Sequence, residues 1–139
     1  MSFTRLRYHI VFTTKNRVRW IRPEVEEFLY PMMIKLTKVL GGRCIRLGGV
    51  EDHIHLICAL PPDITIEDFV RDLKSRSSGA VRANFKKLYG FKWQDEFGVF
   101  SLNPFDMDTI IAYVDNQKHH HAHNRTHKPW EPDASGLVG

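Results

Sequence analysis

The chain has 139 residues, of which 42% are hydrophobic and 26% charged, and its formal net charge is +4 with neutral histidines. This length fits one globular domain with a buried core, which excludes a disordered or fibrous chain. No apolar run is long enough to cross a membrane and no signal peptide is visible, so we expect a cytoplasmic protein; the mildly basic charge permits a nucleic-acid partner without requiring one.

The first forty residues are predicted to form a strand and a long helix. Aromatic and β-branched residues from Tyr8 to Thr13 are typical of a strand. A basic loop follows over residues 14–20, and it is either a solvated connection or a loop that contacts phosphate. Apolar residues at helical spacing then predict a helix over Pro23–Leu40, which Pro31 should kink or divide.

The next segment is predicted to form two antiparallel strands. Arg43–Val50 and His53–Leu60 both have strand-like composition, and only the short acidic pair Glu51–Asp52 separates them, so they should form a hairpin. Both cysteines of the chain, Cys44 and Cys58, fall within these strands. We therefore interpret them as small buried side chains and not as a disulfide.

The second half is predicted to contain helices and one more strand. Thr65–Asp68 resembles a capping box that opens a helix, Ser75–Gly79 should weaken that helix, and a separate helical piece is expected over Val81–Leu88. Gly98–Leu102 predicts a fourth strand. A last helix is expected from about Asp108 to His121.

This order of elements predicts an α+β fold. Strand, helix, strand, strand, helix and strand make a ferredoxin-like split βαβ sandwich, in which a four-stranded antiparallel sheet carries helices on one face. Right-handed crossovers place the first and third strands in the centre of the sheet. We expect a single domain over residues 1–139, with a core over about residues 5–123 that ends in the last helix and a tail over about residues 124–139.

The strand over His53–Leu60 carries the first candidate site. Because successive side chains of a strand point to opposite faces, His53 and His55 share one face while Ile54 lies on the other. If the helices cover the opposite face, the two histidines look out from the open one. Two neighbouring imidazoles fill a core poorly but suit a metal ion that takes a third ligand from another element. Such a pair also arises by chance, so it does not establish a site alone.

The last helix carries the second candidate site. Tyr113 and Gln117 lie four residues apart and therefore share a helix face, although a lone tyrosine of this kind is more often core or rim. The histidines of this region are His119, His120, His121, His123 and His127. Some of them have the spacing of helical zinc ligands, which leaves a zinc protein as another interpretation.

Together these motifs resemble a known family. His53-Ile54-His55 is similar to the His-hydrophobic-His signature of the HUH nucleases, and Tyr113 with Asn116-Gln117 resembles the catalytic tyrosine helix of the small insertion-sequence, IS200-like transposases of that superfamily. The opening Tyr8–Lys15 and the order of elements through residue 121 also resemble that family. Three separated motifs at matching distances are far more specific than any one of them.

The resemblance implies a DNA transposase that cleaves and rejoins single-stranded DNA at element ends folded into hairpins. It implies that His53, His55 and an oxygen of Gln117 hold a divalent cation, and mixed nitrogen and oxygen ligation suits Mg²⁺ or Mn²⁺. Tyr113 would attack phosphorus and leave a 5′-phosphotyrosine and a free 3′-hydroxyl. Because the covalent bond keeps the phosphodiester energy, no nucleotide cofactor is needed.

The resemblance also implies a homodimer, in which two sheets join edge to edge and the tyrosine helix can serve the partner's histidines. Basic residues, and a tryptophan able either to stack on unpaired bases or to plug a core edge, become the expected DNA contacts. They are Lys15, Arg17, Arg19, Lys74, Arg76, Arg82, Lys86 and Trp93. Charges of this kind are more often only a solvated face.

Other functions stay open besides the zinc protein. A replication or mobilisation initiator nuclease would share the histidines, although the short chain without a helicase segment argues against it. A catalytically idle or domesticated protein that binds DNA hairpins predicts binding without a covalent adduct. A tyrosine transposase associated with repeat palindromes is a further alternative, because Trp93-Gln94 and the histidine-rich tail resemble those relatives.

Overall fold

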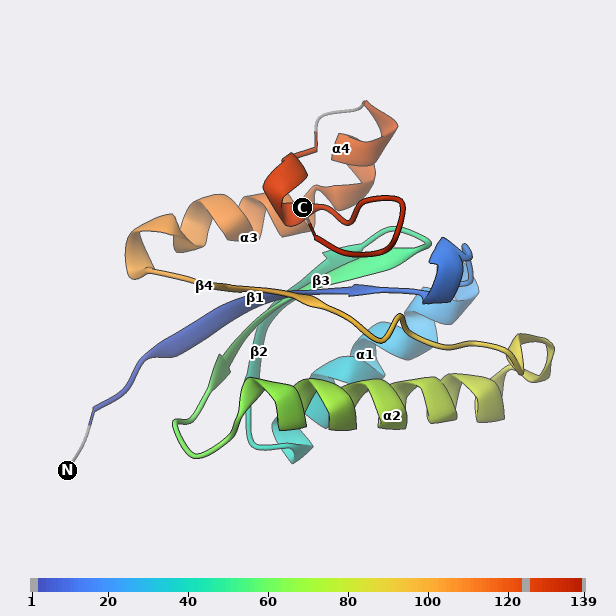
Figure 1. Ribbon diagram of the computed structural model, residues 1–139, viewed down its shortest axis with the longest axis horizontal. Coiled ribbons are helices and arrows are strands. Elements are labelled where there is room, and N and C mark those ends of the chain that lie inside the picture. The colour runs from blue at the N-terminus through green and yellow to red at the C-terminus, as the bar shows by residue number, and fades with distance from the viewer. Residues whose placement is uncertain (1–2, 124–125, 139) are drawn as a thin grey trace.

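A four-stranded antiparallel sheet in the order β2-β3-β1-β4 organises the computed structural model, which describes residues 3–123 and 126–138. The strands are β1 (Leu6–Thr13), β2 (Arg43–Gly49), β3 (His53–Leu60) and β4 (Gly98–Ser101). β1 and β3 occupy the centre, and β2 pairs with β3 as a hairpin. Two helices, α1 (Pro23–Val39) and α2 (Ile66–Asn84), cover one face of this sheet (Figure 1). The predicted α+β, split βαβ fold is therefore confirmed.

Alternation along the central strands gives the sheet two different faces. On the face covered by α1 and α2, apolar side chains such as Ile10, Phe12, Ile54 and Leu56 are fully buried in the main core. Burial contributes about 1.5–3 kcal/mol for each such side chain. The opposite face of β3 carries His53 and the other side chains in alternate positions, so burial of the apolar set fixes the direction in which the histidines point.

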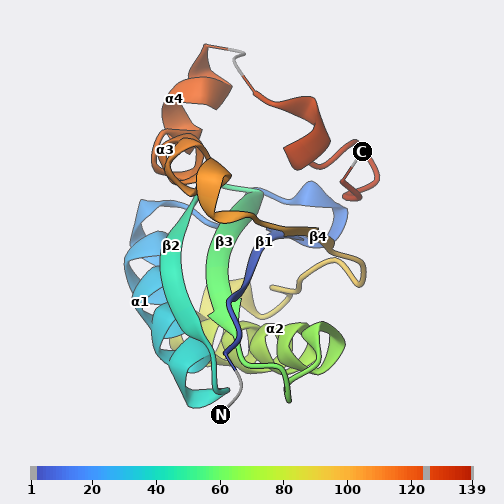
Figure 2. The ribbon, with the colours of Figure 1, turned by 90° about the vertical axis from the view of Figure 1, so that its left-hand side faces the viewer.

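The face that carries the histidines is covered, contrary to the expectation that it would be open. α3 (Met107–Asp115), α4 (Gln117–Ala122) and the tail over residues 126–138 lie on it, on the side of the sheet opposite to α1 and α2 (Figure 2). The cause is a second apolar cluster, in which Ile57 of β3 packs with Met107, Ile110 and Val114 of α3.

Within the described ranges, no helix is long and apolar enough to span a membrane.

Two helices run through stretches that were expected to interrupt them. α1 is not divided at Pro31, because the buried Leu29 and Met33 hold the helix on the sheet on both sides of the proline and outweigh one lost hydrogen bond. α2 likewise runs through Ser75–Gly79 to Asn84, with the fully buried Leu73 and Val81 flanking the weak stretch. The separate helical piece predicted from residue 81 to residue 88 is therefore the end of α2 followed by a short 3₁₀ turn.

The last helix is two helices, α3 and α4, and not the single one predicted from residue 108 to residue 121. Asn116 lies between them with non-helical dihedral angles, φ −104° and ψ 20°. Its side-chain amide donates to the Ala112 carbonyl at 2.7 Å, so an asparagine–backbone bond competes with continuation of the helix. The bend still leaves Tyr113 and Gln117 on the same side, facing the sheet.

The seating of α3 on β2 depends on Gly48. A Cβ at this position would lie 2.5 Å from the Val114 carbonyl oxygen and 3.1 Å from Val114 Cγ1, so only glycine permits the close approach. We expect Gly48→Ala to lower the free energy of unfolding by about 1–3 kcal/mol, because α3 must shift. Thermal or urea unfolding measures this change.

Gly79 provides the matched control. A Cβ there would meet nothing nearer than the Arg82 guanidinium at 3.9 Å, in the interior of α2. Gly79→Ala should therefore raise stability by about 0.5–1 kcal/mol, since alanine favours the helix. Equal stability of both variants would contradict the close contact between Gly48 and α3.

Candidate active site

The two histidines of β3 face a carboxylate that comes from the tail. His53 Nε2 lies 2.8 Å from Glu131 Oε1, and His55 Nε2 lies 3.3 Å from Glu131 Oε2. The histidines are completely buried and Glu131 is 8% exposed. Ligand atoms of these three side chains lie within 4.8 Å of one another, and they form the only such group of histidine, cysteine or acidic side chains in the part of the chain that is described.

This arrangement fits a divalent cation. Two ligands at right angles, each about 2.1 Å from Mg²⁺, lie about 3 Å apart, and the two histidine–carboxylate distances fall on either side of that value. Gln117 adds a further oxygen: its Oε1 is buried without a hydrogen-bond partner, while its Nε2 lies 3.2 Å from Glu131 Oε2. Because a flip of the side-chain amide exchanges its oxygen and nitrogen, Gln117 Oε1 can face the position between the two histidines and Glu131. Nitrogen and oxygen donors together suit Mg²⁺ or Mn²⁺.

An acidic partner orients His53 from behind. His53 Nδ1 donates to Asp52 Oδ1 at 2.8 Å, and Arg17 Nη2 holds the other oxygen at 3.1 Å. Burial opposes charge on Asp52, but the hydrogen bond to His53 and the pairing with Arg17 outweigh it and lower the pKa of this carboxyl. A proton fixed on Nδ1 leaves Nε2 of His53 available to a metal ion, the arrangement found behind many metal-binding histidines.

Tyr113 lies on the same carboxylate but is covered. Its hydroxyl donates to Glu131 Oε2 and accepts the backbone N–H of His127 at 2.7 Å. Trp130 meets the ring edge to face with centroids 5.1 Å apart, His120 stacks on it at 5.0 Å, and Tyr113 is only 7% exposed. Burial, followed by the hydrogen bond to Glu131, raises the pKa of the phenol above its ordinary value. The phenol is therefore protonated at rest.

The structure brings the predicted residues His53, His55, Tyr113 and Gln117 together within one chain. It adds Glu131, which the sequence reasoning missed. The residue stands in a tail without periodicity, where no spacing relates it to the histidines. The available signal was local: Trp130, one large aromatic in an otherwise polar segment, is half-buried, and it anchors the tail beside Tyr113.

The C-terminal histidines do not form a separate zinc site within the described ranges. His121 Nε2 binds Glu131 Oε1 at 2.8 Å and so belongs to the same site. The rings of His119 and His123 lie 4.2 Å apart, but His123 Nδ1 donates to the His119 carbonyl at 2.9 Å, and no further ligand makes a group of three there. Three other histidines lie at the site: His120 and His127 contact the Tyr113 ring, and His121 contacts the carboxylate.

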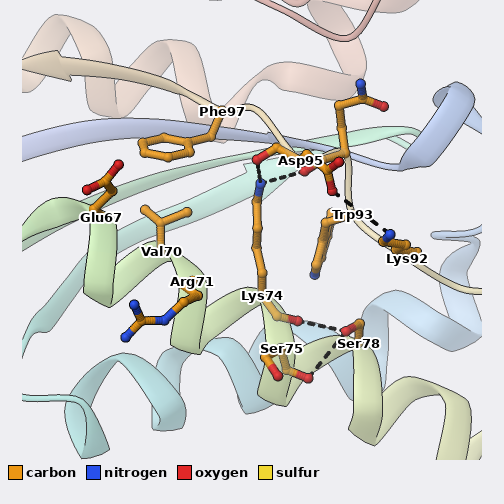
Figure 3. A pocket seen from close by; sticks show the side chains of 11 residues that line it. Glu67, Val70, Arg71, Lys74, Ser75, Ser78, Lys92, Trp93, Asp95 and Phe97 are labelled. Carbon is orange, nitrogen blue, oxygen red and sulfur yellow. Dashed lines mark hydrogen bonds and ion pairs between the residues drawn. The ribbon is translucent and has the colours of Figure 1, made fainter.

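Several expected DNA contacts are engaged inside the protein. Figure 3 shows Lys74 reaching from α2 to the segment before β4, where its Nζ donates to the carbonyls of Asp95 at 2.9 Å and Glu96 at 3.2 Å. Burial lowers the pKa of Lys74 to about 8. Trp93 is 2% exposed, and its Nε1 donates to Ser77 Oγ at 2.9 Å. Trp93 is thus a plug at the core edge and does not present its face to a base.

The remaining basic positions differ in how open they are. Arg82 Nη1 donates to the Phe91 carbonyl at 2.8 Å, and Arg17 is paired with Asp52. Lys15 is half-buried. The exposed basic residues among those predicted are Arg19, Arg76, Arg82 and Lys86, although Arg82 also holds the Phe91 carbonyl. These four stay the accessible candidates for contact with a phosphate backbone.

The chain is similar to known transposases over most of its length. The family model described as "Transposase IS200 like" matches residues 2–117, a range that includes both β3 histidines, Tyr113 and Gln117 but ends before Glu131. The ISDra2 transposase TnpA of Deinococcus radiodurans is 25% identical over 117 residues, which cover 81% of this chain and 84% of that protein. The IS200 transposase of Salmonella typhimurium is 29% identical over 104 residues, covering 75% of this chain and 66% of that protein.

Solved structures share the fold. A crystal structure of a candidate transposase from Deinococcus radiodurans superposes with a TM-score of 0.71 and 26% identity, over 84% of this chain and 93% of that one. A REP-associated tyrosine transposase bound to a REP hairpin gives a TM-score of 0.64 with 19% identity, over 91% of this chain and 76% of that one. The second likeness shows the fold alone.

Proposed function

Since this chain belongs to the family of IS200-like transposases, we propose that it cleaves and rejoins single-stranded DNA, with Tyr113 as nucleophile and a divalent cation as cofactor. The observation that supports this proposal is the convergence of the tyrosine hydroxyl, two histidines and Gln117 on one carboxylate, Glu131. Transposase membership by itself gives the class of enzyme. The site geometry supports the finer assignment.

The proposed metal ligands are His53 Nε2, His55 Nε2 and the Glu131 carboxylate, with Gln117 Oε1 within reach. This set keeps Gln117 as predicted from the sequence and adds the tail carboxylate. When bound, the cation would supply Lewis-acid stabilisation of the charge that develops on the scissile phosphate. Mg²⁺ and Mn²⁺ are both proposed, because each accepts imidazole, carboxylate and amide-oxygen ligands while leaving positions open.

Tyr113 carries the covalent step in this proposal. Its phenolic oxygen attacks phosphorus, a tyrosine O–P bond forms, and the bond between phosphorus and the 3′-oxygen breaks. The products are a 5′-phosphotyrosine and a DNA 3′-hydroxyl. The phenolic proton leaves along the existing hydrogen bond to Glu131 Oε2, and the departing 3′-oxygen takes a proton from solvent. Attack by a 3′-hydroxyl on the phosphotyrosine reverses these changes and rejoins DNA.

The His127 backbone and the Trp130 ring must move aside before DNA can react, while Glu131 keeps its contacts with His53 and Tyr113. A phosphate cannot reach the Tyr113 hydroxyl while the His127 backbone and Trp130 cover it, since the residue is only 7% exposed. Single-stranded DNA folded into hairpins is the proposed substrate, on the strength of the family resemblance. A homodimer joined at sheet edges is proposed on the same grounds, and β2 and β4 are the two edge strands.

Labelled DNA tests the proposal and its polarity. Single-stranded hairpin DNA taken from the sequences that flank the gene is incubated with the full chain and Mn²⁺. DNA labelled at its 3′ end should yield a labelled protein adduct that survives denaturation, while DNA labelled at its 5′ end should yield a shorter released fragment. Salt-sensitive binding without adduct would instead favour a catalytically idle hairpin-binding protein.

Glu131 gives a sharper test of the metal centre. We expect Glu131→Gln to weaken Mn²⁺ binding by more than about 100-fold, because a neutral amide replaces the only carboxylate of the proposed ligand set and the change should exceed that typical of a group behind a ligand. Electron paramagnetic resonance of free Mn²⁺ measures the dissociation constant.

Glu51→Gln is the matched control, because Glu51 is exposed just before the histidine strand. That variant should bind Mn²⁺ as the unaltered chain does. If Glu131→Gln bound the ion normally and formed more adduct, the carboxylate would be a cover over the site and not a ligand.

A further inference from the structure

His9 lies directly behind His55. The two residues are on the central strands β1 and β3, and His9 Nε2 is 2.8 Å from His55 Nδ1. Both rings are completely buried and they stack with centroids 5.0 Å apart. Phe100 at 5.5 Å and Trp130 at 5.7 Å pack against the His9 ring. His9 is thus held in one place, with its Nε2 at the back of His55.

The two imidazoles constrain each other's protons. If Nε2 of His55 binds a cation, its ring proton must sit on Nδ1, and His9 Nε2 must then accept the hydrogen bond. Without a cation, the reverse arrangement lets His9 Nε2 donate and leaves a proton on His55 Nε2, which faces the Glu131 carboxylate at 3.3 Å. A neutral imidazole at position 9 can serve both arrangements, because the same nitrogen can accept or donate.

The unfavourable burial of a ring nitrogen of His9 indicates that this histidine has a role besides packing. His9 Nδ1 is buried and has no hydrogen-bond partner among the described residues. A buried ring nitrogen without a hydrogen-bond partner lowers the free energy of unfolding, a loss that an apolar ring of the same size would avoid. His53 has a corresponding partner behind it in Asp52, so each β3 histidine meets a hydrogen-bonding group at Nδ1.

We propose that His9 is a positioning residue, which orients His55 and sets its tautomer so that Nε2 is presented to the cation. This inference rests on the proposed metal centre and extends it to β1. His9 touches neither the cation nor DNA in this assignment. Its effect should therefore appear as weaker metal binding, which additional metal can overcome.

Three substitutions of His9 separate the possible roles. His9→Phe keeps a ring of similar size but cannot form the hydrogen bond, and it should raise the Mn²⁺ dissociation constant about 10–100-fold. His9→Asn is polar but too short to reach His55, so it should behave like His9→Phe even if the aromatic variant folds poorly. His9→Gln can place an amide near the position of Nε2, and it should stay within about threefold of the unaltered chain.

The adduct assay provides the second measurement. For His9→Phe and His9→Asn, the half-saturating Mn²⁺ concentration should rise while the adduct rate at saturating Mn²⁺ recovers. Phe100→Leu is the packing control: it loosens the surroundings of the His9 ring without removing a hydrogen bond, and its Mn²⁺ affinity should change less than about twofold. Thermal unfolding of each variant checks that the fold is kept.

The outcomes distinguish this inference from the function on which it rests. If His53→Ala binds Mn²⁺ as tightly as the unaltered chain, the proposed metal centre is wrong and the role of His9 fails with it. If His53→Ala loses Mn²⁺ while His9→Phe and His9→Asn bind it normally, the metal centre stands and His9 is only a packing residue. A loss in all three His9 variants, including His9→Gln, would also reject control through the hydrogen bond.

Discussion

Tyr113→Phe is expected to abolish the covalent protein–DNA adduct while the protein stays folded. The substitution removes one oxygen atom, which is the proposed nucleophile, and keeps the ring that packs against Trp130 and His120. No other group can replace that oxygen, so adduct formation should fall by at least about a thousandfold. Gel electrophoresis of denatured reaction mixtures with DNA labelled at its 3′ end measures this loss.

Two controls accompany the Tyr113 variant. Tyr89→Phe removes a hydroxyl from a tyrosine that is 83% exposed and far from the carboxylate in the fold, and its adduct yield should not change. Tyr113→Phe should still bind Mn²⁺, because the phenol is not one of the proposed ligands. An undiminished adduct in Tyr113→Phe would reject Tyr113 as the nucleophile.

His53→Ala is expected to lose both Mn²⁺ binding and strand cleavage. His53 is completely buried, and its two ring nitrogens lie 2.8 Å from Asp52 and from Glu131. Removal of the ring deletes a direct ligand, so the effect should exceed the 10–100-fold change typical of a group behind a ligand and reach more than about 100-fold in metal affinity. Calorimetric titration with Mn²⁺ and the adduct assay measure the two losses.

An exposed histidine provides the comparison for His53→Ala. His123 lies just after α4, where it bonds only the preceding helical turn among the described contacts, and His123→Ala should bind Mn²⁺ normally. Chelation of divalent ions should stop adduct formation by the unaltered chain in the same way as His53→Ala does. Adduct formation that persists in a chelator would contradict the requirement for a cation.

The central sheet was predictable because its signals are local. Side chains of a strand alternate in direction, so His53 and His55 of β3 share one face whatever else the chain does, and a two-residue connection leaves β2 few alternatives to a hairpin. Helix lengths were less predictable. Pro31 and Ser75–Gly79 are weak helix formers, yet burial of neighbours such as Leu73 outweighs those local preferences.

The tail could not be predicted by the same reasoning. Glu131 lies at the histidines next to Trp130, which packs beside Tyr113, and that contact joins residues from different elements. No periodicity or spacing in the sequence encodes such a contact. The prediction of Gln117 near the site was possible because four residues of helix fix its relation to Tyr113, and this relation survives the bend at Asn116.

The carboxylate site draws all its side chains from a single polypeptide. Tyr113 and His53 meet the same Glu131 of their own chain, whereas the family resemblance also allowed the tyrosine to serve a second subunit. This arrangement bears on complementation between two inactive variants. When Tyr113→Phe and His53→Ala chains are mixed and allowed to exchange subunits, sites built from one chain leave every dimer inactive. Sites shared between subunits would instead restore activity to the mixed dimers.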